Sequence, residues 1–321
     1  VLVSFSCTGP LIGTALVEAS SEGFMGPLVV MGGFSLALAI PFSLFAAFPS
    51  WLNSLPKSGG WMNSVKVILG FAELALAFKF LSIADMTAHW GILKYELFMG
   101  IWVVVAFAMA AYLFGWIRFP HDSPNRRVTP IPAMMGLLFA IIGIYLATGL
   151  LGSKETGTYN SLSLMSGLAP PAHYNFFRPL EEVKQEQSGQ FASLTKCANN
   201  FDCFHDYYEG LAYAREKNKP ILLDFTGYGC VNCRKTEEHI WSREEIRKVI
   251  NDEYVLISLY VDDKLDMDTV RRSAVTNERI RTVGQKWSDF QIVNFEQNSQ
   301  PLYVIVSPDE KVLTTPRGYD P

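Results

Sequence analysis

Charged residues are scarce in the first half of this chain. Residues 1–152 carry very few of them, whereas residues 181–321 are rich in Lys, Arg, Asp and Glu. The formal net charge of −4 is spread over both signs, so the sequence offers no basic surface of the kind that binds nucleic acid. We therefore expect an apolar environment for the first half, water for the second, and no nucleic-acid partner.

The chain also lacks an initial Met and a basic segment ahead of its first apolar run. A signal peptide would show a basic segment there, so this run is not one. We interpret the sequence as an excerpt that begins inside, or just before, a membrane segment of a longer protein.

Long apolar runs occupy the first half of the chain. A membrane-spanning helix needs about 20 mostly apolar residues. Two of the runs, 27–48 and 132–152, contain no charged residue. The runs that meet the length requirement are 1–19, 27–48, 61–82, 97–118 and 132–152. We therefore predict an α-helical membrane bundle of about five spanning helices over residues 1–152, embedded in a lipid bilayer.

The third run is the least apolar, because it carries Lys66, Glu73 and Lys79. A carboxylate inside a membrane span is costly and is often functional. Glu73 is therefore a candidate functional residue. The alternative is a plain ion pair with Lys66, which lies two turns away on the same helix face.

The loops between the runs predict an orientation. One loop carries Lys57, and another carries Arg118, Arg126 and Arg127. Under the positive-inside rule both loops are cytoplasmic. The polar half after residue 152 is then extracytoplasmic, which in a bacterial inner-membrane protein means the periplasm, where disulfides form and persist.

Cysteine is rare, and no cysteine lies between Cys7 and Cys197. Cys7 is followed by Gly9 and Pro10, which loosen a membrane helix, and a broken helix in the bilayer usually lines a cavity. We favour a functional Cys7 on that ground. The alternative is that a buried Cys serves only as a small apolar residue.

The polar half predicts a linker followed by an α/β domain. Residues 153–190 are rich in Ser, Gly, Pro and Glu without periodicity, which is typical of a linker. Short apolar runs read as strands, and amphipathic runs read as helices. The expected elements of the domain over 191–321 are a helix in 204–220, a strand in 221–227, a helix in 234–252, a strand in 254–263 and a hairpin that begins with a strand in 300–308.

A Cys-x-x-Cys pair lies at the predicted strand-to-helix junction. A thiol at a helix N-terminus has a lowered pKa, because the macrodipole and free N–H groups favour the thiolate. Cys230 is thus the expected exposed nucleophile, and Cys233, one turn into the helix, the buried resolving thiol. Asp224, on the incoming strand, is a candidate proton acceptor for Cys233. The alternative for Asp224 is an ordinary carboxylate at a strand end.

Two other chemistries of a Cys-x-x-Cys pair can be weighed. Covalent haem attachment needs His directly after the second Cys, and Arg234 stands there. A zinc site would need Cys197 and Cys203 as further ligands, and their separation of six positions is wider than the usual spacing. We favour a structural disulfide between Cys197 and Cys203, with a second redox couple as the alternative. The redox reading needs no organic cofactor and no metal.

Three segments carry a resemblance to known families. "LDFTGYGCVNCRK" (223–235), with Gln300 and Pro301 downstream, resembles the thioredoxin fold. "SFSCTGPL" (4–11) and "LPKSGGWMNSVK" (55–66) resemble the transmembrane electron-transfer domain of the DsbD family of thiol:disulfide interchange proteins. The phrase "FTGYGCVNCRK" is similar to the version in Bacteroidetes-type members.

The resemblance implies a membrane protein-disulfide reductase in the bacterial inner membrane. In such a protein electrons enter from cytoplasmic thioredoxin, cross through membrane cysteines and leave to periplasmic thiol–disulfide proteins. It implies that Cys7 is one of two membrane redox cysteines and that Cys230 and Cys233 are the terminal couple. It also implies that Asp224 is the buried carboxylate and that Pro301 is a cis-proline beside the couple. Pro301 suits the start of a strand in any case, because proline cannot donate to a sheet ladder.

The sequence departs from the family pattern in three respects, one of which is that "CANNFDC" (197–203) has no counterpart in the family that can be assigned. The partner of Cys7 is expected in an earlier, inverted-repeat half of the membrane domain. An N-terminal periplasmic domain is missing, and the last helix of the thioredoxin-like domain is expected beyond Pro321. The alternatives left open are a membrane-tethered disulfide oxidase or isomerase, and a transporter with a thioredoxin-like accessory module.

Overall fold

The computed structural model describes residues 60–119, 130–153, 158–160, 162–176, 193–198 and 201–319, with scattered residues between 28 and 43. The predicted spans 1–19 and most of 27–48 lie outside the described residues, and so does Cys7. The chain divides into two compact units. One comprises Val1–Glu73 and Gly115–Val128, and the other comprises Leu74–Phe114 and Thr129–Pro321.

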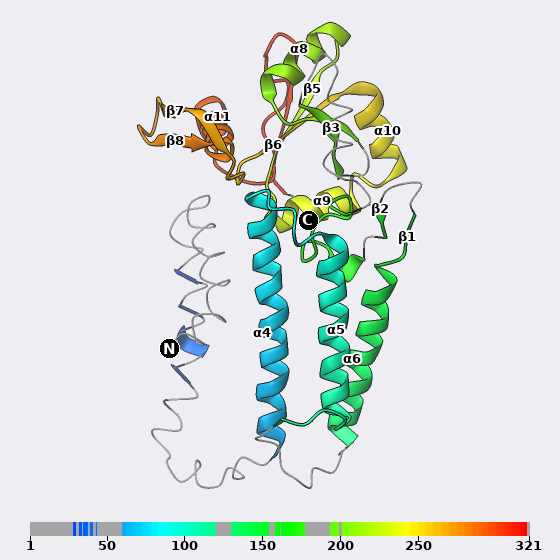
Figure 1. Cartoon of the computed structure of the whole chain (residues 1–321). Coiled ribbons are helices and arrows are strands. Elements are labelled where there is room, and N and C mark those ends of the chain that lie inside the picture. Colours follow the sequence, from blue (N-terminus) through cyan, green and yellow to red (C-terminus); the bar gives the residue numbers. More distant parts are fainter. Residues whose placement is uncertain are drawn as a thin grey trace. The chain divides into compact units, whose positions relative to one another are not determined.

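Three long apolar helices correspond to the last three predicted spans. They are α4 (Gly60–Thr87), α5 (Tyr95–Leu113) and α6 (Pro130–Thr148). All three are long and apolar enough to cross a bilayer. Helices α5 and α6 pack side by side (Figure 1), and a Cβ on Gly143 would lie 3.2 Å from the Phe107 ring. The helical membrane part of the expected fold class is confirmed for these segments.

The polar half folds around a five-stranded sheet in the order β3-β4-β6-β5-β9. Strands β4, β5 and β6 are parallel, whereas β3 and β9 are antiparallel edge strands. The bounds are β3 Leu194–Lys196, β4 Asp202–Phe204, β5 Ile221–Thr226, β6 Val255–Tyr260 and β9 Leu302–Val306. Strands β5, β6 and β9 lie within the predicted strand segments.

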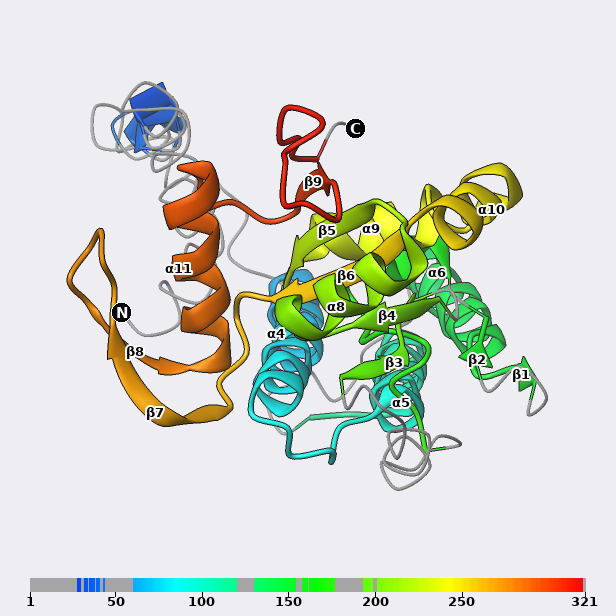
Figure 2. The same cartoon turned by 90° about the horizontal axis from the view of Figure 1, so that it is seen from above.

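Helices cover both faces of this sheet, and Figure 2 shows α8 in front of the strands and α9 behind them. Asp206 caps α8 by accepting hydrogen bonds from the backbone N–H groups of Tyr208 and Glu209. The segment 234–252, expected as one helix, forms parts of two, because the chain turns between α9 and α10 and buries Trp241 against Phe201. The helices are α8 Tyr207–Lys217, α9 Val231–His239, α10 Glu244–Glu253 and α11 Val283–Phe295.

Alternation along β5 assigns its side chains to two layers, because successive residues of a strand point to opposite faces. Ile221, Leu223 and Phe225 join the main apolar core, which also holds residues of α8 and α11. Leu222 packs against a second apolar cluster on the other face, which holds Trp241 and Ile250 of α10. Asp224 and Thr226 share the face of Leu222, and this is the face that α9 covers. The carboxyl group of Asp224 is thus directed toward the helix of the Cys pair by strand periodicity alone.

The sequence did not predict a hairpin that lies between β6 and α11. It consists of β7 (Asp266–Arg272) and β8 (Arg279–Thr282) and leads directly into α11. The start of α11 has a sequence signature, a capping box in which Thr282 and Gln285 satisfy each other's backbone N–H groups. The hairpin itself has no such signature, because β7 is mostly exposed and lacks the apolar alternation of a half-buried strand.

Part of the segment predicted as a linker is packed. Strands β1 (Gly152–Ser153) and β2 (Thr158–Tyr159) form a short ladder, and the 3-10 turn η1 (Ser163–Met165) follows. The Tyr159 ring stacks on Tyr95 of α5 at 5.1 Å, and Met165 is buried in the same cluster. Irregular backbone has no period, so composition alone did not reveal this packing.

Candidate redox site

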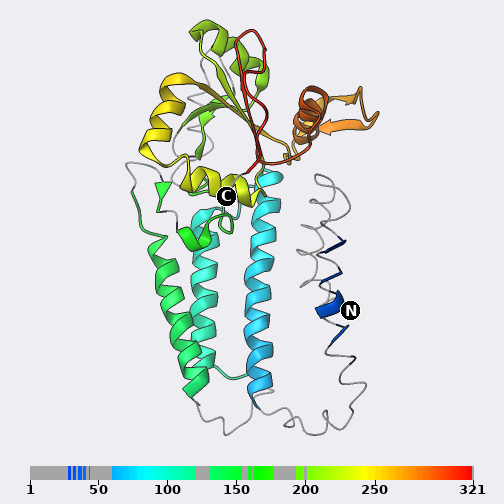
Figure 3. The same ribbon diagram turned by 180° about the vertical axis from the view of Figure 1, so that it is seen from behind.

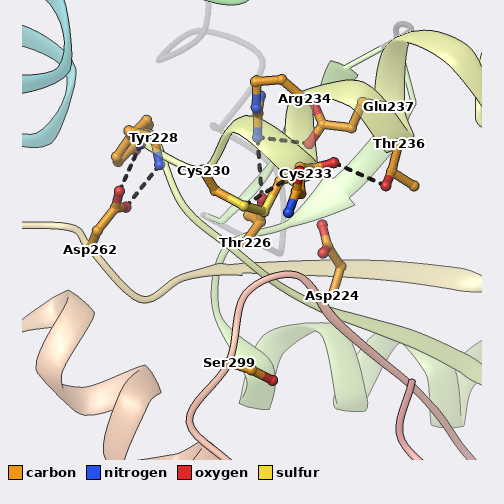
Figure 4. Close-up of a disulfide and its surroundings, with 12 residues drawn as sticks. Asp224, Thr226, Tyr228, Cys230, Cys233, Arg234, Thr236, Glu237, Asp262 and Ser299 are labelled. Carbon is orange, nitrogen blue, oxygen red and sulfur yellow. Dashed lines mark hydrogen bonds and ion pairs between the residues drawn. A yellow bond between two sulfur atoms is a disulfide. The ribbon is translucent and has the colours of Figure 1, made fainter. Parts of the chain in front are cut away.

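The Cys pair lies where β5 gives way to α9 (Figure 4). Cys230 is the N-cap residue of α9, and its Sγ accepts a hydrogen bond from the backbone N–H of Cys233 at 3.1 Å. Cys230 and Cys233 are joined in a disulfide. The N-terminal N–H groups and the dipole of α9 stabilise a negative charge at the N-cap position. The site therefore favours a thiolate on Cys230 once the disulfide opens.

The burial of the pair differs in part from the expectation. Cys233 is buried as expected, with 1% of its surface exposed, but Cys230 is only 8% exposed. Residues on both sides of Cys230 have close neighbours from outside the sheet domain. A Cβ on Gly229 would lie 3.2 Å from Cγ2 of Ile83 in α4, and a Cβ on Gly167 would lie 2.5 Å from Cγ1 of Val231. Figure 3 likewise places α9 beside the end of α4 that finishes at Thr87. The prediction of an exposed Cys230 is wrong for this conformation.

A carboxylate holds the loop ahead of the pair. Oδ1 of Asp262 accepts from the backbone N–H of Tyr228, and Oδ2 accepts from that of Gly229, both at 2.8 Å (Figure 4). Gly227 begins this loop, where a Cβ would meet Oε1 of Gln300 and lie 2.9 Å from Oδ2 of Asp262. Asp262 therefore fixes the loop that presents Cys230.

Asp224 lies below α9 and is 1% exposed. Its Oδ2 accepts a hydrogen bond from the Ser258 hydroxyl at 3.1 Å, while Oδ1 has no hydrogen-bond partner among the described residues. Burial, and next the negative charge of Glu237, raise the pKa of Asp224 to about 8. Figure 4 shows its carboxyl group directed toward the Cys233 side of the helix. Asp224 is therefore a buried acid that keeps its proton at neutral pH.

Replacing Asp224 by Asn should stabilise the oxidised chain in alkaline solution. The unfolded carboxyl group ionises near pH 3.9 and the folded one near pH 8, so wild-type stability falls as the pH rises between these values. Asn cannot ionise and keeps an acceptor for Ser258. We expect a gain of about 5 kcal/mol at pH 8 and almost none at pH 4, measured as the shift in Tm of the chain in detergent. A lower Tm for Asp224→Asn at pH 8 would contradict this account.

A buried ion pair lies directly after the Cys pair. Nη2 of Arg234 lies 2.7 Å from Oε1 of Glu237 and donates to the Thr226 hydroxyl at 3.2 Å. Both charged residues are almost fully buried. Burial raises the pKa of Glu237 to about 7, against the opposing charge of Arg234. The pair ties α9 to β5 and adds a polar layer beside Asp224.

Pro301 lies immediately before β9, as expected for a residue that cannot donate to a ladder. Its peptide bond to Gln300 is cis, which agrees with the feature that the resemblance implied. Leu302 pairs with Phe225, so Pro301 lies at the end of β5 from which the Cys loop departs. The contact between Gln300 and Gly227 places the two loops together.

The other two cysteines form their own disulfide, as predicted. Cys197 and Cys203 are joined across the β3–β4 hairpin and lie within the Trp241 cluster. Among the described residues, Cys197, Cys203 and His205 come close enough to share a metal ion, and Cys230 and Cys233 are not part of that group. The four-cysteine zinc alternative is therefore contradicted.

Three residues of this site were missed from the sequence. The i, i+3 spacing of Arg234 and Glu237 is a common surface pattern, so their burial could not be recognised without the packing of α9. Asp262 follows β6 and reaches the Cys loop only because β5 and β6 are adjacent and parallel. The pairing of strands, which the sequence did not specify, would have located it.

Comparison with known proteins relates both halves of the chain to redox proteins. A thioredoxin-like family model matches residues 202–308. The thiol:disulfide interchange protein DsbD of Vibrio cholerae is 27% identical over 268 residues, which cover 83% of this chain and 37% of that protein. The DsbD protein of Salmonella typhi is 25% identical over 262 residues, covering 79% of this chain and 36% of that protein. The chain thus spans little more than a third of the length of these relatives.

A solved structure of a DsbH oxidoreductase also overlaps with the chain. It is 18% identical, and the match covers 43% of this chain and 87% of that one with a TM-score of 0.26.

Proposed function

We propose that this chain, which belongs to the DsbD family of thiol:disulfide interchange proteins, is part of a membrane protein-disulfide reductase. Its Cys230–Cys233 pair receives electrons that arrive through the membrane half and passes them to disulfides of other proteins. The donor at the far side is a cytoplasmic thioredoxin, and the acceptors are periplasmic thiol–disulfide proteins.

The observation that carries the proposal is the Cys pair at the N-terminus of α9, in a chain that also has membrane-length helices. A thiolate favoured by a helix N-terminus is both a nucleophile and a leaving group in thiol–disulfide exchange. Metal ligation is not needed for this chemistry.

Exchange at the pair moves two electrons in two displacements. An incoming thiolate attacks Sγ of Cys230, the Cys230–Cys233 bond breaks, and Cys233 leaves as a thiolate that takes up one proton. The second thiolate of the donor then attacks the donor sulfur that is bonded to Cys230. This releases Cys230 as a thiolate and leaves the donor with a disulfide. Delivery runs in reverse: Cys230 attacks the acceptor disulfide and Cys233 resolves the adduct.

Asp224 serves these steps as a proton donor and acceptor for Cys233. Its raised pKa of about 8 supports this role, since a group near the pKa of a thiol exchanges protons with it in both directions. Pro301 bounds the same end of the sheet and shapes the surface on which a partner's disulfide would lie. Within the membrane half, Cys7 is one of the two cysteines that pass electrons outward.

The proposed location is the bacterial inner membrane, with the residues after about 152 in the periplasm. The positive loops support this orientation. The turn at residues 87–89 contacts the α/β domain, because the backbone N–H of Lys264 donates to the carbonyl of Thr87 at 3.0 Å. The domain boundaries proposed are 1–152, 153–190 and 191–321.

The test is the redox state of the pair in growing cells that produce the full-length protein. Free thiols are alkylated after acid quenching, and the Cys230–Cys233 peptide is measured by mass spectrometry. We expect the pair to be largely reduced in wild type and oxidised in Cys7→Ser, with Ser6→Ala as a control that behaves like wild type. Equal reduction in Cys7→Ser would favour a transporter with an accessory domain.

A further inference from the structure

A buried lysine in α4 holds a segment that faces the Cys pair. Nζ of Lys79 donates to the backbone carbonyl of Gly167 at 2.8 Å, and both partners are buried in this contact. Gly167 belongs to residues 163–169, here called the strap. A charge inside a membrane-length helix is costly unless it is satisfied. Lys79 thus uses its charge to fix the strap in place.

The strap is shaped to receive the start of α9. Gly167 has a φ of +71°, in the left-handed region that favours glycine. A Cβ at Gly167 would lie 2.5 Å from Cγ1 and 3.1 Å from the backbone oxygen of Val231, the residue after Cys230. Only a glycine permits this approach, so the backbone of the strap lies directly against the N-terminal turn of α9.

A second contact fixes the other side of the loop. Nε2 of His89 lies 2.9 Å from Oδ1 of Asp263, next to the Asp262 that holds the Cys loop. The His89 ring also meets the Tyr228 ring edge to face at 5.7 Å between centroids. The hydrogen bond to Asp263 raises the pKa of His89, which favours the charged pair.

We propose that Lys79, Ile83, His89 and the strap form an intramolecular seat that covers Cys230, so that the Cys pair must leave the seat before another protein's disulfide or dithiol can reach it. This inference rests on the proposed function, in which the Cys pair receives its electrons from the membrane half while it is in the seat. These contacts are made by the residues on both sides of Cys230, which is itself 8% exposed.

The seat predicts a difference between small and large reaction partners. A small dithiol can enter a narrow gap, whereas a folded protein needs the whole face around Cys230. Weakening the seat should therefore speed attack by a protein much more than attack by a small molecule. The full-length protein, oxidised and in lipid nanodiscs, carries Cys7→Ser so that electrons come only from the added reductant.

The experiment compares reduction of the Cys230–Cys233 disulfide by dithiothreitol and by a purified, reduced bacterial thioredoxin, read by alkylation and mass spectrometry. In Lys79→Met and in His89→Ala we expect the thioredoxin rate to rise about tenfold, as loss of about 1.4 kcal/mol of docking predicts, and the dithiothreitol rate to change less than about threefold. Lys79→Arg keeps a donor for Gly167 and should behave like the parent.

Gly167→Val supplies an independent test with a matched control. It forces a side chain into Val231, whereas Gly100→Val places one in α5 where a Cβ meets nothing within 4 Å. Only the Gly167 variant should raise the thioredoxin rate. If the ratio of the two rates is unchanged in Lys79→Met, His89→Ala and Gly167→Val, the seat is refuted. That result would leave the reductase proposal intact, because no electron transfer through the membrane half is measured.

Discussion

Cys230→Ser is expected to abolish disulfide exchange, whereas Cys233→Ala is expected to stop it halfway. Only Cys230 occupies the N-cap of α9, where N–H groups and the helix dipole favour a thiolate. With the chain reduced, desalted and mixed with insulin, Cys230→Ser should lower the rate of disulfide cleavage by at least about 10³-fold. Cys233→Ala should still attack, but it cannot resolve the adduct, so it should accumulate one mixed disulfide per chain.

The second pair of cysteines provides the control for this result. Cys197 and Cys203 are buried in the Trp241 cluster, Cys197 directly after β3 and Cys203 within β4. A Cys197→Ala, Cys203→Ala double variant should keep the exchange rate within about threefold of wild type. Loss of exchange in that variant, with Cys230 and Cys233 intact, would show that Cys197 and Cys203 are needed for exchange. That result would contradict the assignment of the activity to Cys230 and Cys233 alone.

Arg234→Met is expected to cause the largest loss of stability in the α/β domain. The substitution leaves Glu237 buried without its cation and removes the hydrogen bond to Thr226. Breaking a buried pair by removing one partner costs about 3–5 kcal/mol. Lys217→Met serves as the comparison, because Lys217 pairs with Glu216 on the surface, where such a pair contributes little. The measurement is the Tm of each oxidised variant in the same detergent.

A double variant distinguishes the lost pair from a general packing defect. Arg234→Met with Glu237→Gln removes both charges, so the uncompensated carboxylate disappears and most of the lost stability should return. A double variant as unstable as Arg234→Met alone would show that the ion pair is not the cause. An Arg234→Met chain no less stable than Lys217→Met would contradict the account of the polar layer.

The parts of the fold that the sequence predicted are those set by local periodicity. The apolar run 221–227 became β5, and its alternation placed Asp224 on the α9 face. The Cys pair fell at the strand-to-helix junction because the run ends just before a helical pattern. Long apolar runs likewise became α4, α5 and α6. In each case the type of element is decided by residues that are close together in the sequence.

The parts that were missed depend on residues far apart in the sequence. Asp262 reaches the Cys loop across 33 residues, and His89 meets Asp263 across 174. Gly229 and Val231, on either side of Cys230, also have neighbours far away in the sequence, Ile83 and Gly167, and the motif alone predicted an exposed thiol. The strap could not be predicted from the sequence either, because neither the left-handed conformation of Gly167 nor its contact with Lys79 produces a periodic pattern.

The most direct test of the central claim is the identity of the partner bound to the Cys233→Ala chain. Cells that produce the full-length variant are acid-quenched, and the mixed disulfide is purified and sequenced by mass spectrometry. The account predicts a bond from Cys230 to a cysteine of the membrane half or of another thiol–disulfide protein. The absence of any adduct, or an adduct formed only through Cys197 or Cys203, would contradict it.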